Sequence, residues 1–211
     1  MTEQGTLEAI TSSRVVAIVR EGSADAAKRE VERLVEAGIR VVEVSLSTPG
    51  ALEVARWMAD EMDAEGLHFG VGTVLAAHDV EEAAATGASF IVSPISRAGL
   101  ISTCKELGLV SIVGAMTPTE CVVASDGGAD LLKLFPANMW TLDALKGLLQ
   151  ALPELRLVPT GGITLSSAKT WLDAGAVAVG MGSALRTTGS VRPLQAALEA
   201  LALVGSAGLD D

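Results

Sequence analysis

Short apolar runs recur along the chain at a nearly constant spacing, and this period constrains the fold more than any other feature. There are eight such runs, and from the second onward successive runs begin 20 to 27 residues apart. Each interval holds one strand, one helix and two short loops. The runs predict strands at Val15–Val19, Val41–Ser45, His68–Gly72, Phe90–Ser93, Val110–Gly114, Leu131–Leu134, Arg156–Thr160 and Ala178–Met181.

The segments between these runs have the spacing of amphipathic helices. In residues 25–37 an apolar stripe lies opposite charged side chains, and its members are Ala27, Val31, Leu34 and Val35. Glycines such as Gly38 and Gly175 follow the helical segments, as expected where a helix ends in left-handed backbone. The eighth unit has its own expected helix at Val191–Leu203.

Eight strand–helix units without a linker or a shift in composition predict a single domain over residues 1–211. Its expected class is α/β and its expected architecture is a closed parallel (β/α)8 barrel, the TIM barrel. A doubly wound open sheet also alternates strands and helices, and alternation alone does not exclude it. The number eight and the even spacing favour the barrel, and 211 residues are close to the shortest length that closes one.

Composition narrows the possible chemistry. The chain has no Tyr, two His and two Cys, which excludes a His-rich metal cage and a disulfide scaffold, so no metal and no cofactor are expected. A net charge of −11 without a basic block excludes binding to nucleic acid or to an anionic membrane surface. The first residues do not have the pattern of a signal peptide, and no apolar run reaches about 20 residues. Two cysteines 17 residues apart fit a reducing compartment, so the expected location is cytoplasmic. His68 is expected at the inert end of the barrel and His78 in solvent, with Cys104 and Cys121 buried.

Lys133 stands out because the other four lysines lie in helix-like segments, whereas Lys133 interrupts an apolar strand. Side chains alternate along a strand, so Lys133 shares a face with Leu131 and Phe135, while Leu132 and Leu134 pack under the helices. A buried amine is costly unless it is paired or deprotonated, and a deprotonated amine can form a Schiff base with a ketone. The alternative is a lysine that pairs structurally with a carboxylate or a phosphate at the barrel mouth.

Glu43 follows the same alternation in the second strand, where it shares a face with Val41 and Ser45. Facing the same interior as Lys133, its carboxylate is either an ion-pair partner or a general base whose pKa is raised by burial. The two roles are compatible.

Glycine-rich segments end the last two strands, at Thr160-Gly161-Gly162 and at Gly180-Met181-Gly182-Ser183. Backbone N–H groups at glycines approach phosphate oxygens closely, and barrel enzymes usually hold phosphate after strands seven and eight. These segments therefore predict a phosphate site, although the glycines could also serve tight turns alone. Thr73, after the third strand, is expected to be either a ligand group or a helix N-cap.

Over nearly its whole length the chain resembles the class I (Schiff-base) aldolases that act on 2-keto-3-deoxy-6-phosphogluconate (KDPG) and 4-hydroxy-2-oxoglutarate (KHG). The resemblance is carried by Val42-Glu43-Val44, Val71–Val74, Ser93-Pro94, Leu132–Ala137, Pro159–Ile163 and Gly180–Ser183. This family is a (β/α)8 barrel that usually assembles as a homotrimer. The implied reaction is reversible cleavage of a 2-keto-3-deoxy-6-phosphosugar acid to pyruvate and glyceraldehyde 3-phosphate, in sugar-acid catabolism of the Entner–Doudoroff kind.

Carried over residue by residue, the resemblance implies that Lys133 forms the Schiff base and Glu43 shuttles protons. It implies that the substrate is held by Arg20, Thr73, Phe135 and Thr160. The phosphate would be held by Gly161, Gly162, Gly182 and Ser183.

Two positions depart from the family pattern. Many gluconate-type members have Arg where this chain has Ser47, and that Arg contacts the pyruvate carboxylate. The segment Glu43-Val44-Ser45-Leu46-Ser47-Thr48-Pro49 looks more like relatives that act on the galactonate epimer. The loss of a bidentate guanidinium weakens carboxylate binding, and Arg20 is the candidate to compensate. The second departure is Val113, where the family often has Pro.

Two further functions are compatible with the residues. One is a phosphate-binding barrel enzyme of another chemistry, such as a phosphosugar isomerase or a synthase, for which turnover would depend on Mg²⁺. The other is a non-catalytic phosphosugar-binding barrel, which would bind ligand without cleaving it.

Overall fold

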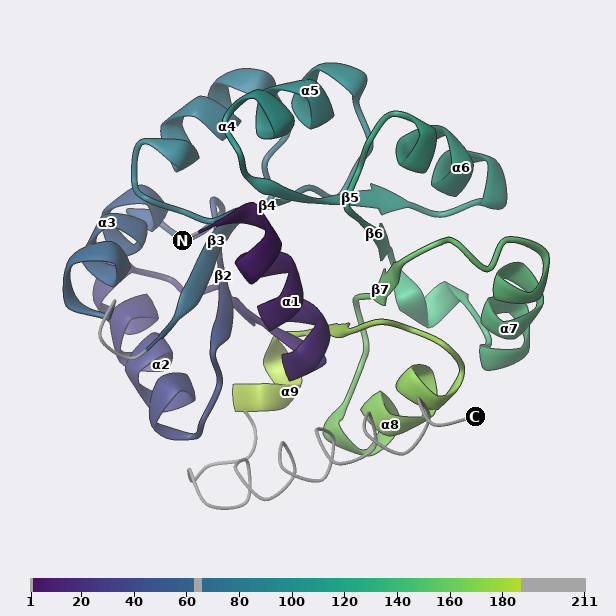
Figure 1. The fold of residues 1–211 in the computed structure, drawn as a ribbon. Coiled ribbons are helices and arrows are strands. Elements are labelled where there is room, and N and C mark those ends of the chain that lie inside the picture. Colours follow the sequence, from purple (N-terminus) through teal and green to yellow (C-terminus); the bar gives the residue numbers. More distant parts are fainter. Residues whose placement is uncertain (1, 63–65, 187–211) are drawn as a thin grey trace.

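A computed structural model describes residues 2–62 and 66–186 and has eight parallel strands that alternate with helices around a central axis (Figure 1). The strands are β1 (Val15–Val19), β2 (Val41–Ser45), β3 (His68–Gly72), β4 (Phe90–Val92), β5 (Val110–Ala115), β6 (Leu131–Leu134), β7 (Leu157–Pro159) and β8 (Val179–Met181). The helices are α1 (Glu3–Ser13), α2 (Ala24–Glu36), α3 (Ala51–Glu61), α4 (Ala77–Ala84), α5 (Ala98–Glu106), α6 (Pro118–Asp126), α7 (Leu142–Ala151), α8 (Leu165–Asp173) and α9 (Ser183–Arg186), with a 3₁₀ turn η2 at Ala137–Met139. The helix predicted at Val191–Leu203 lies outside the described residues.

The strands follow one another around the ring in chain order, from β1 to β7, with β8 beside β1. The ring closes between β7 and β8 through a parallel bridge from Thr160 to Gly180 and a hydrogen bond from the Val177 amide to the Leu157 carbonyl (3.0 Å). A doubly wound sheet would reverse its strand order partway, so the predicted (β/α)8 barrel is confirmed and the open-sheet alternative is wrong.

Every predicted strand is present, with ends that differ by at most one residue. Ser93 lies just past β4, yet its amide still donates to the Ile112 carbonyl (2.9 Å). Thr160 lies past β7, where its amide donates to the Leu134 carbonyl (3.0 Å) and its backbone forms a parallel bridge to Gly180. Strand ends at the mouth therefore carry polar residues whose backbone is still held by a neighbouring strand.

Side-chain alternation divides the core into an inner and an outer layer. Leu131 and Val41 belong to the cluster inside the barrel, together with Phe90 and Ile112. Their chain neighbours belong to the outer cluster between strands and helices, which includes Val42, Val44, Leu132 and Leu134. The predicted stripe of α2 packs into this outer layer and consists of Ala27, Val31, Leu34 and Val35.

Helix α1, which the strand–helix period did not predict, lies across the centre of the ring (Figure 1). Its Ile10 is fully buried and packs into the inner cluster, and its Thr6 hydroxyl lies 3.1 Å from Nδ1 of His68 at the start of β3. This helix covers the amino end of the barrel, which leaves the carboxyl end for a site. His68 is thus at the inert end, as predicted.

Helix ends also agree with the sequence. Gly38 after α2 and Gly175 after α8 have φ angles of 95° and 107°, the left-handed backbone that glycine adopts without strain. Within the described ranges, no helix is both long and apolar enough to cross a membrane.

Candidate active site

A cavity of about 480 Å³ opens at the carboxyl ends of the strands. Nine of the ten predicted site residues line it, namely Arg20, Thr73, Lys133, Phe135, Thr160, Gly161, Gly162, Gly182 and Ser183. The tenth, Glu43, is buried and does not line the cavity. The wall is completed by Ile18, Pro94, Ile163, Gly180 and Arg186, which were not predicted as site residues.

Lys133 lies in β6 with only 6% of its surface exposed, between Leu132 and Leu134 of the outer layer. Its side chain therefore points into the barrel and reaches the cavity. The Nζ atom lies 5.1 Å from the centroid of the Phe135 ring, within the range of a cation–π contact. The other four lysines are all on helices (α2, α5, α7 and α8), so Lys133 alone can present an amine to this cavity among the described residues.

Glu43 lies in β2 and is 1% exposed, with Val42 and Val44 on the outer face. Burial raises the pKa of the Glu43 carboxyl, and the charges of Lys133 and Arg20 lower it part of the way back. A carboxyl whose pKa is raised by burial holds its proton more readily than an exposed one, so it can both accept and donate a proton during a reaction.

Gly72 at the end of β3 makes room for Glu43. A Cβ atom at Gly72 would collide with the Glu43 carboxyl group and with its Cγ atom. Any side chain at residue 72 must therefore displace the Glu43 carboxylate. A packed core has few voids, so the displaced group has no nearby space to move into without disturbing its neighbours.

We expect Gly72→Ala to destabilise the barrel by about 1–3 kcal/mol through overpacking and to lower any turnover that depends on Glu43 by about tenfold or more, because it moves that carboxyl group. Gly99→Ala is the matched control, because a Cβ at Gly99 in α5 meets nothing within 4 Å and alanine favours a helix. Urea denaturation and steady-state rates of both variants test this expectation. A Gly72→Ala protein with wild-type rates would show that the position of Glu43 does not matter.

Thr73 has a φ angle of 63°, which is unusual for a residue with a branched side chain. Its hydroxyl lies 2.8 Å from Ser45 Oγ, which lies 2.8 Å from Ser47 Oγ. Helix α4 begins later, after an N-cap at Ala76, so the N-cap interpretation of Thr73 is wrong. Ser47, at the position where many relatives have Arg, thus takes part in a chain of hydroxyls that ends at the cavity wall.

The opposite side of the cavity is built from backbone. Gly161 and Gly162 have φ angles of 100° and 80°, and a Cβ at Gly180 would collide with the Thr160 side chain. Gly161, Gly162 and Gly180 line the cavity together with Gly182 and Ser183, and glycines let anion oxygens come close to backbone N–H groups. Thr160 itself is 5% exposed, and its hydroxyl donates to the Val158 carbonyl (3.2 Å).

Charge in the cavity is opposite in sign to that of the chain. Three side chains of its described wall are cations, namely Arg20, Lys133 and Arg186, and none is a carboxylate, although the chain carries a net charge of −11. Low-dielectric walls focus such a field and raise the local concentration of anions. The cavity therefore suits a ligand with more than one negative charge.

Other groups that the sequence singled out lie away from this site. His78 is largely exposed on α4, and burial raises the pKa of the Cys104 and Cys121 thiols to about 12 and about 11. Among the described residues, no group of three or more His, Cys, Asp or Glu side chains is arranged to hold a metal ion.

Arg186 is the charged wall residue that sequence reasoning missed. It belongs to α9 and follows Ser183 by three residues, so the two share one side of that helix. A helix of four residues has too short a pattern to indicate this in the sequence, so no local signal singled out Arg186.

Together these features define a (β/α)8 barrel with a buried lysine, a buried carboxyl and a cation-lined cavity at its mouth. A family model described as KDPG and KHG aldolase matches residues 7–197. The chain belongs to this aldolase family, and the sequence-based assignment to its carbon–carbon lyases is confirmed.

Individual relatives agree with the family model. The 2-dehydro-3-deoxy-6-phosphogalactonate aldolase of Escherichia coli K12 is 31% identical over 85% of this chain and 87% of its own length. The 2-dehydro-3-deoxy-phosphogluconate aldolase of Zymomonas mobilis is 37% identical over 74% of each chain. A crystal structure of the 2-keto-3-deoxy-6-phosphogluconate aldolase of Z. mobilis ZM4, with 3-phosphoglycerate, superposes with a TM-score of 0.82 and 30% identity, over 95% of this chain and 96% of that one.

Proposed function

We propose that this chain, a single (β/α)8 domain, is a class I aldolase that reversibly cleaves a 2-keto-3-deoxy-6-phosphosugar acid to pyruvate and glyceraldehyde 3-phosphate. The observation that carries the proposal is that Lys133 lines the cavity while the buried Glu43 carboxyl interacts electrostatically with it. An amine and a proton-transferring carboxyl are the two groups that Schiff-base cleavage requires.

The reaction begins when the neutral Lys133 amine attacks the C2 ketone and forms a carbinolamine, which loses water to give an iminium ion. Glu43 removes the proton of the C4 hydroxyl as the C3–C4 bond breaks, and the bond electrons move to the iminium nitrogen. Glyceraldehyde 3-phosphate leaves, and Glu43 returns the proton to C3 of the enamine. Water then hydrolyses the iminium and releases pyruvate. The iminium is the electron sink, so the proposed chemistry uses no metal and no cofactor.

The two ends of such a substrate are both anionic, and the cavity has a group for each. We assign the carboxylate to Arg20 and Thr73, and the phosphate to the backbone at Gly161, Gly162, Gly182 and Ser183. Phe135 and Thr160 pack against the carbon chain between them. The Z. mobilis relative that was crystallised with 3-phosphoglycerate supports this assignment, since that ligand also carries one carboxylate and one phosphate.

We propose that both the gluconate and the galactonate forms are substrates. Relatives named for each form match this chain at 37% and 31% identity. The hydroxyl chain through Ser47 replaces a guanidinium that would hold the substrate carboxylate more rigidly. A carboxylate that is held less rigidly is compatible with either configuration at C4.

Release of pyruvate from each substrate tests the proposed function, with lactate dehydrogenase as the coupling enzyme. We expect cleavage of both phosphorylated acids and a kcat/KM for 4-hydroxy-2-oxoglutarate that is lower by about 100-fold, because that substrate lacks the phosphate and its charge-assisted hydrogen bonds. EDTA should leave the rates unchanged. Turnover that depends on Mg²⁺ would instead indicate a barrel enzyme of another chemistry, and tight binding without cleavage would indicate a non-catalytic sugar-phosphate binder.

We further propose a cytoplasmic homotrimer. The family resemblance supports this state, as do a mean hydropathy of +0.44 and exposed apolar side chains such as Val123 and Met139. A light-scattering mass of three chains is the expected result.

A further inference from the structure

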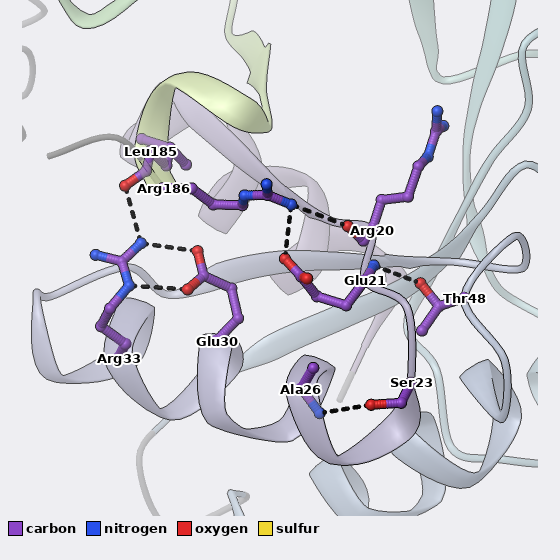
Figure 2. A network of polar contacts seen from close by, with 9 residues as sticks. All are labelled: Arg20, Glu21, Ser23, Ala26, Glu30, Arg33, Thr48, Leu185 and Arg186. Atoms are coloured by element: carbon purple, nitrogen blue, oxygen red, sulfur yellow. Dashed lines mark hydrogen bonds and ion pairs between the residues drawn. The ribbon is translucent and has the colours of Figure 1, made fainter. Parts of the chain in front are cut away.

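An ion pair spans the rim of the barrel between its first and last strands (Figure 2). Arg186 of α9 donates from Nη1 to Glu21 Oε1 at 2.9 Å and to the carbonyl oxygen of Arg20 at 3.4 Å. Arg20 and Glu21 follow β1, whereas Arg186 follows β8 and the Gly182-Ser183 segment. We call the pair Arg186–Glu21 the rim strap. It joins the loop that carries Arg20 to helix α9, which begins at Ser183.

Both ends of the rim strap are held in place by further hydrogen bonds. On the β1 side, the Glu21 amide donates to Thr48 Oγ1 at 3.1 Å, which ties this loop to the loop after β2. On the β8 side, Arg33 of α2 donates from Nη2 to the Leu185 carbonyl at 2.8 Å. Arg33 is itself fixed by two hydrogen bonds to Glu30, at 2.7 and 2.8 Å. The strap therefore connects the loop after β1, which is tied to the loop after β2, to helix α9, which is tied to α2.

Exposure indicates that the rim strap affects geometry more than stability. The Arg186 side chain is 51% exposed and that of Glu21 is 20% exposed. Ion pairs with this degree of solvent contact contribute little to the free energy of unfolding, because water screens them and ordering the side chains costs entropy. A substitution in the strap should therefore leave the fold intact and act through the loops that it joins.

We propose that Arg186 is a positioning residue whose pairing with Glu21 sets the separation of Arg20 and Ser183, so that both anionic ends of one ligand bind at the same time. This inference rests on the proposed function for its assignment of the two ends. Arg186 also lines the cavity, but its Nη1 is already shared between Glu21 and the Arg20 carbonyl. Those two contacts favour positioning over a direct charge on the ligand.

Calorimetric binding of 3-phosphoglycerate tests the rim strap without catalysis, because this ligand carries both anions and has no ketone for Lys133 to attack. We expect Arg186→Met and Glu21→Met each to raise its Kd up to about fivefold, the largest effect that an ion pair of this exposure can have on the loops that it joins. The double variant should also be weaker by about fivefold rather than about 25-fold, because both changes break the same interaction. Arg186→Lys, which keeps a cation in reach of Glu21, should recover part of the affinity.

Lys169→Met is the matched control, since it removes an ion pair of similar exposure, to Asp173 on α8, away from the rim. The Kd of Lys169→Met for 3-phosphoglycerate should equal that of the wild type. The Tm of every variant should also equal the wild-type Tm. Wild-type affinity in Glu21→Met with weak binding in Arg186→Met would overturn the proposal and assign Arg186 a direct contact. The proposal would also be overturned if Arg186→Met and Glu21→Met both kept wild-type affinity, or if their effects on Kd multiplied in the double variant. The same holds if the wild type did not bind 3-phosphoglycerate. Failure of the proposed function would appear separately, as absent pyruvate release.

Discussion

Replacing Lys133 with arginine should abolish aldol cleavage, with a fall in kcat/KM of about 10⁴-fold or more. The variant keeps a positive charge next to Glu43, so the charge balance of the barrel interior is retained. A guanidinium does not deprotonate in proteins and cannot attack a ketone, which removes the step that all later steps depend on. Steady-state rates with either phosphorylated acid measure this effect.

Lys146→Arg is the matched control for this prediction, because Lys146 is exposed on α7 and does not line the cavity. It should retain wild-type rates. Chemical denaturation should show that Lys133→Arg remains folded. More than about 1% of wild-type activity in a folded Lys133→Arg protein would contradict the role of Lys133 as the nucleophile.

Replacing Glu43 with glutamine should lower kcat by about 10²–10⁴-fold, because the amide cannot carry the proton from the C4 hydroxyl to C3. Glutamine has nearly the same shape, so it should fit the space that Gly72 leaves open. Covalent trapping of pyruvate on Lys133 should persist, although more slowly. Wild-type kcat in this variant would exclude Glu43 from proton transfer.

The same variant gives a pH dependence with a definite sign. Burial raises the pKa of Glu43 above its ordinary value of 4.5, so between pH 4.5 and the raised pKa the folded state binds more protons than the unfolded state. The stability that neutral Glu43 contributes is present below pH 4.5 and is lost as pH rises through the folded pKa. The unfolding free energy of the wild type, relative to Glu43→Gln, should therefore decrease from pH 4.5 toward neutrality in urea titrations. An increase over that range would contradict the direction of the shift.

Much of this site could be predicted because it follows from side-chain alternation in strands. Once β2 and β6 are placed, Glu43 and Lys133 must face inward, because Val42, Val44, Leu132 and Leu134 need the outer layer. Parallel strands in a barrel then bring their carboxyl ends to one mouth, where nine of the predicted residues do line a single cavity. Side-chain alternation and barrel closure together were therefore sufficient to predict these residues.

The remaining features depend on contacts that have no local pattern. The role proposed for Arg186 depends on its contact with Glu21, which lies 165 residues earlier in the chain. A helix of four residues also has too little periodicity to indicate which side chain faces the rim. The left-handed backbone of Thr73 and the hydroxyl chain through Ser45 and Ser47 arise where the loops after β2 and β3 meet. Helix α1 is not part of the strand–helix period, so the sequence pattern does not place it. Its position at the amino end of the barrel depends on the packing of Ile10 into the inner cluster.

Covalent trapping tests the central claim most directly. The folded protein is incubated with pyruvate and sodium borohydride, and peptide mass spectrometry then locates the modification. Schiff-base chemistry predicts a reduced pyruvyl adduct on Lys133 with loss of activity, and no adduct on Lys146 or in the Lys133→Arg variant. A folded wild-type protein that gains no adduct, or gains it on another lysine, would contradict the assignment of Lys133 as the Schiff-base residue.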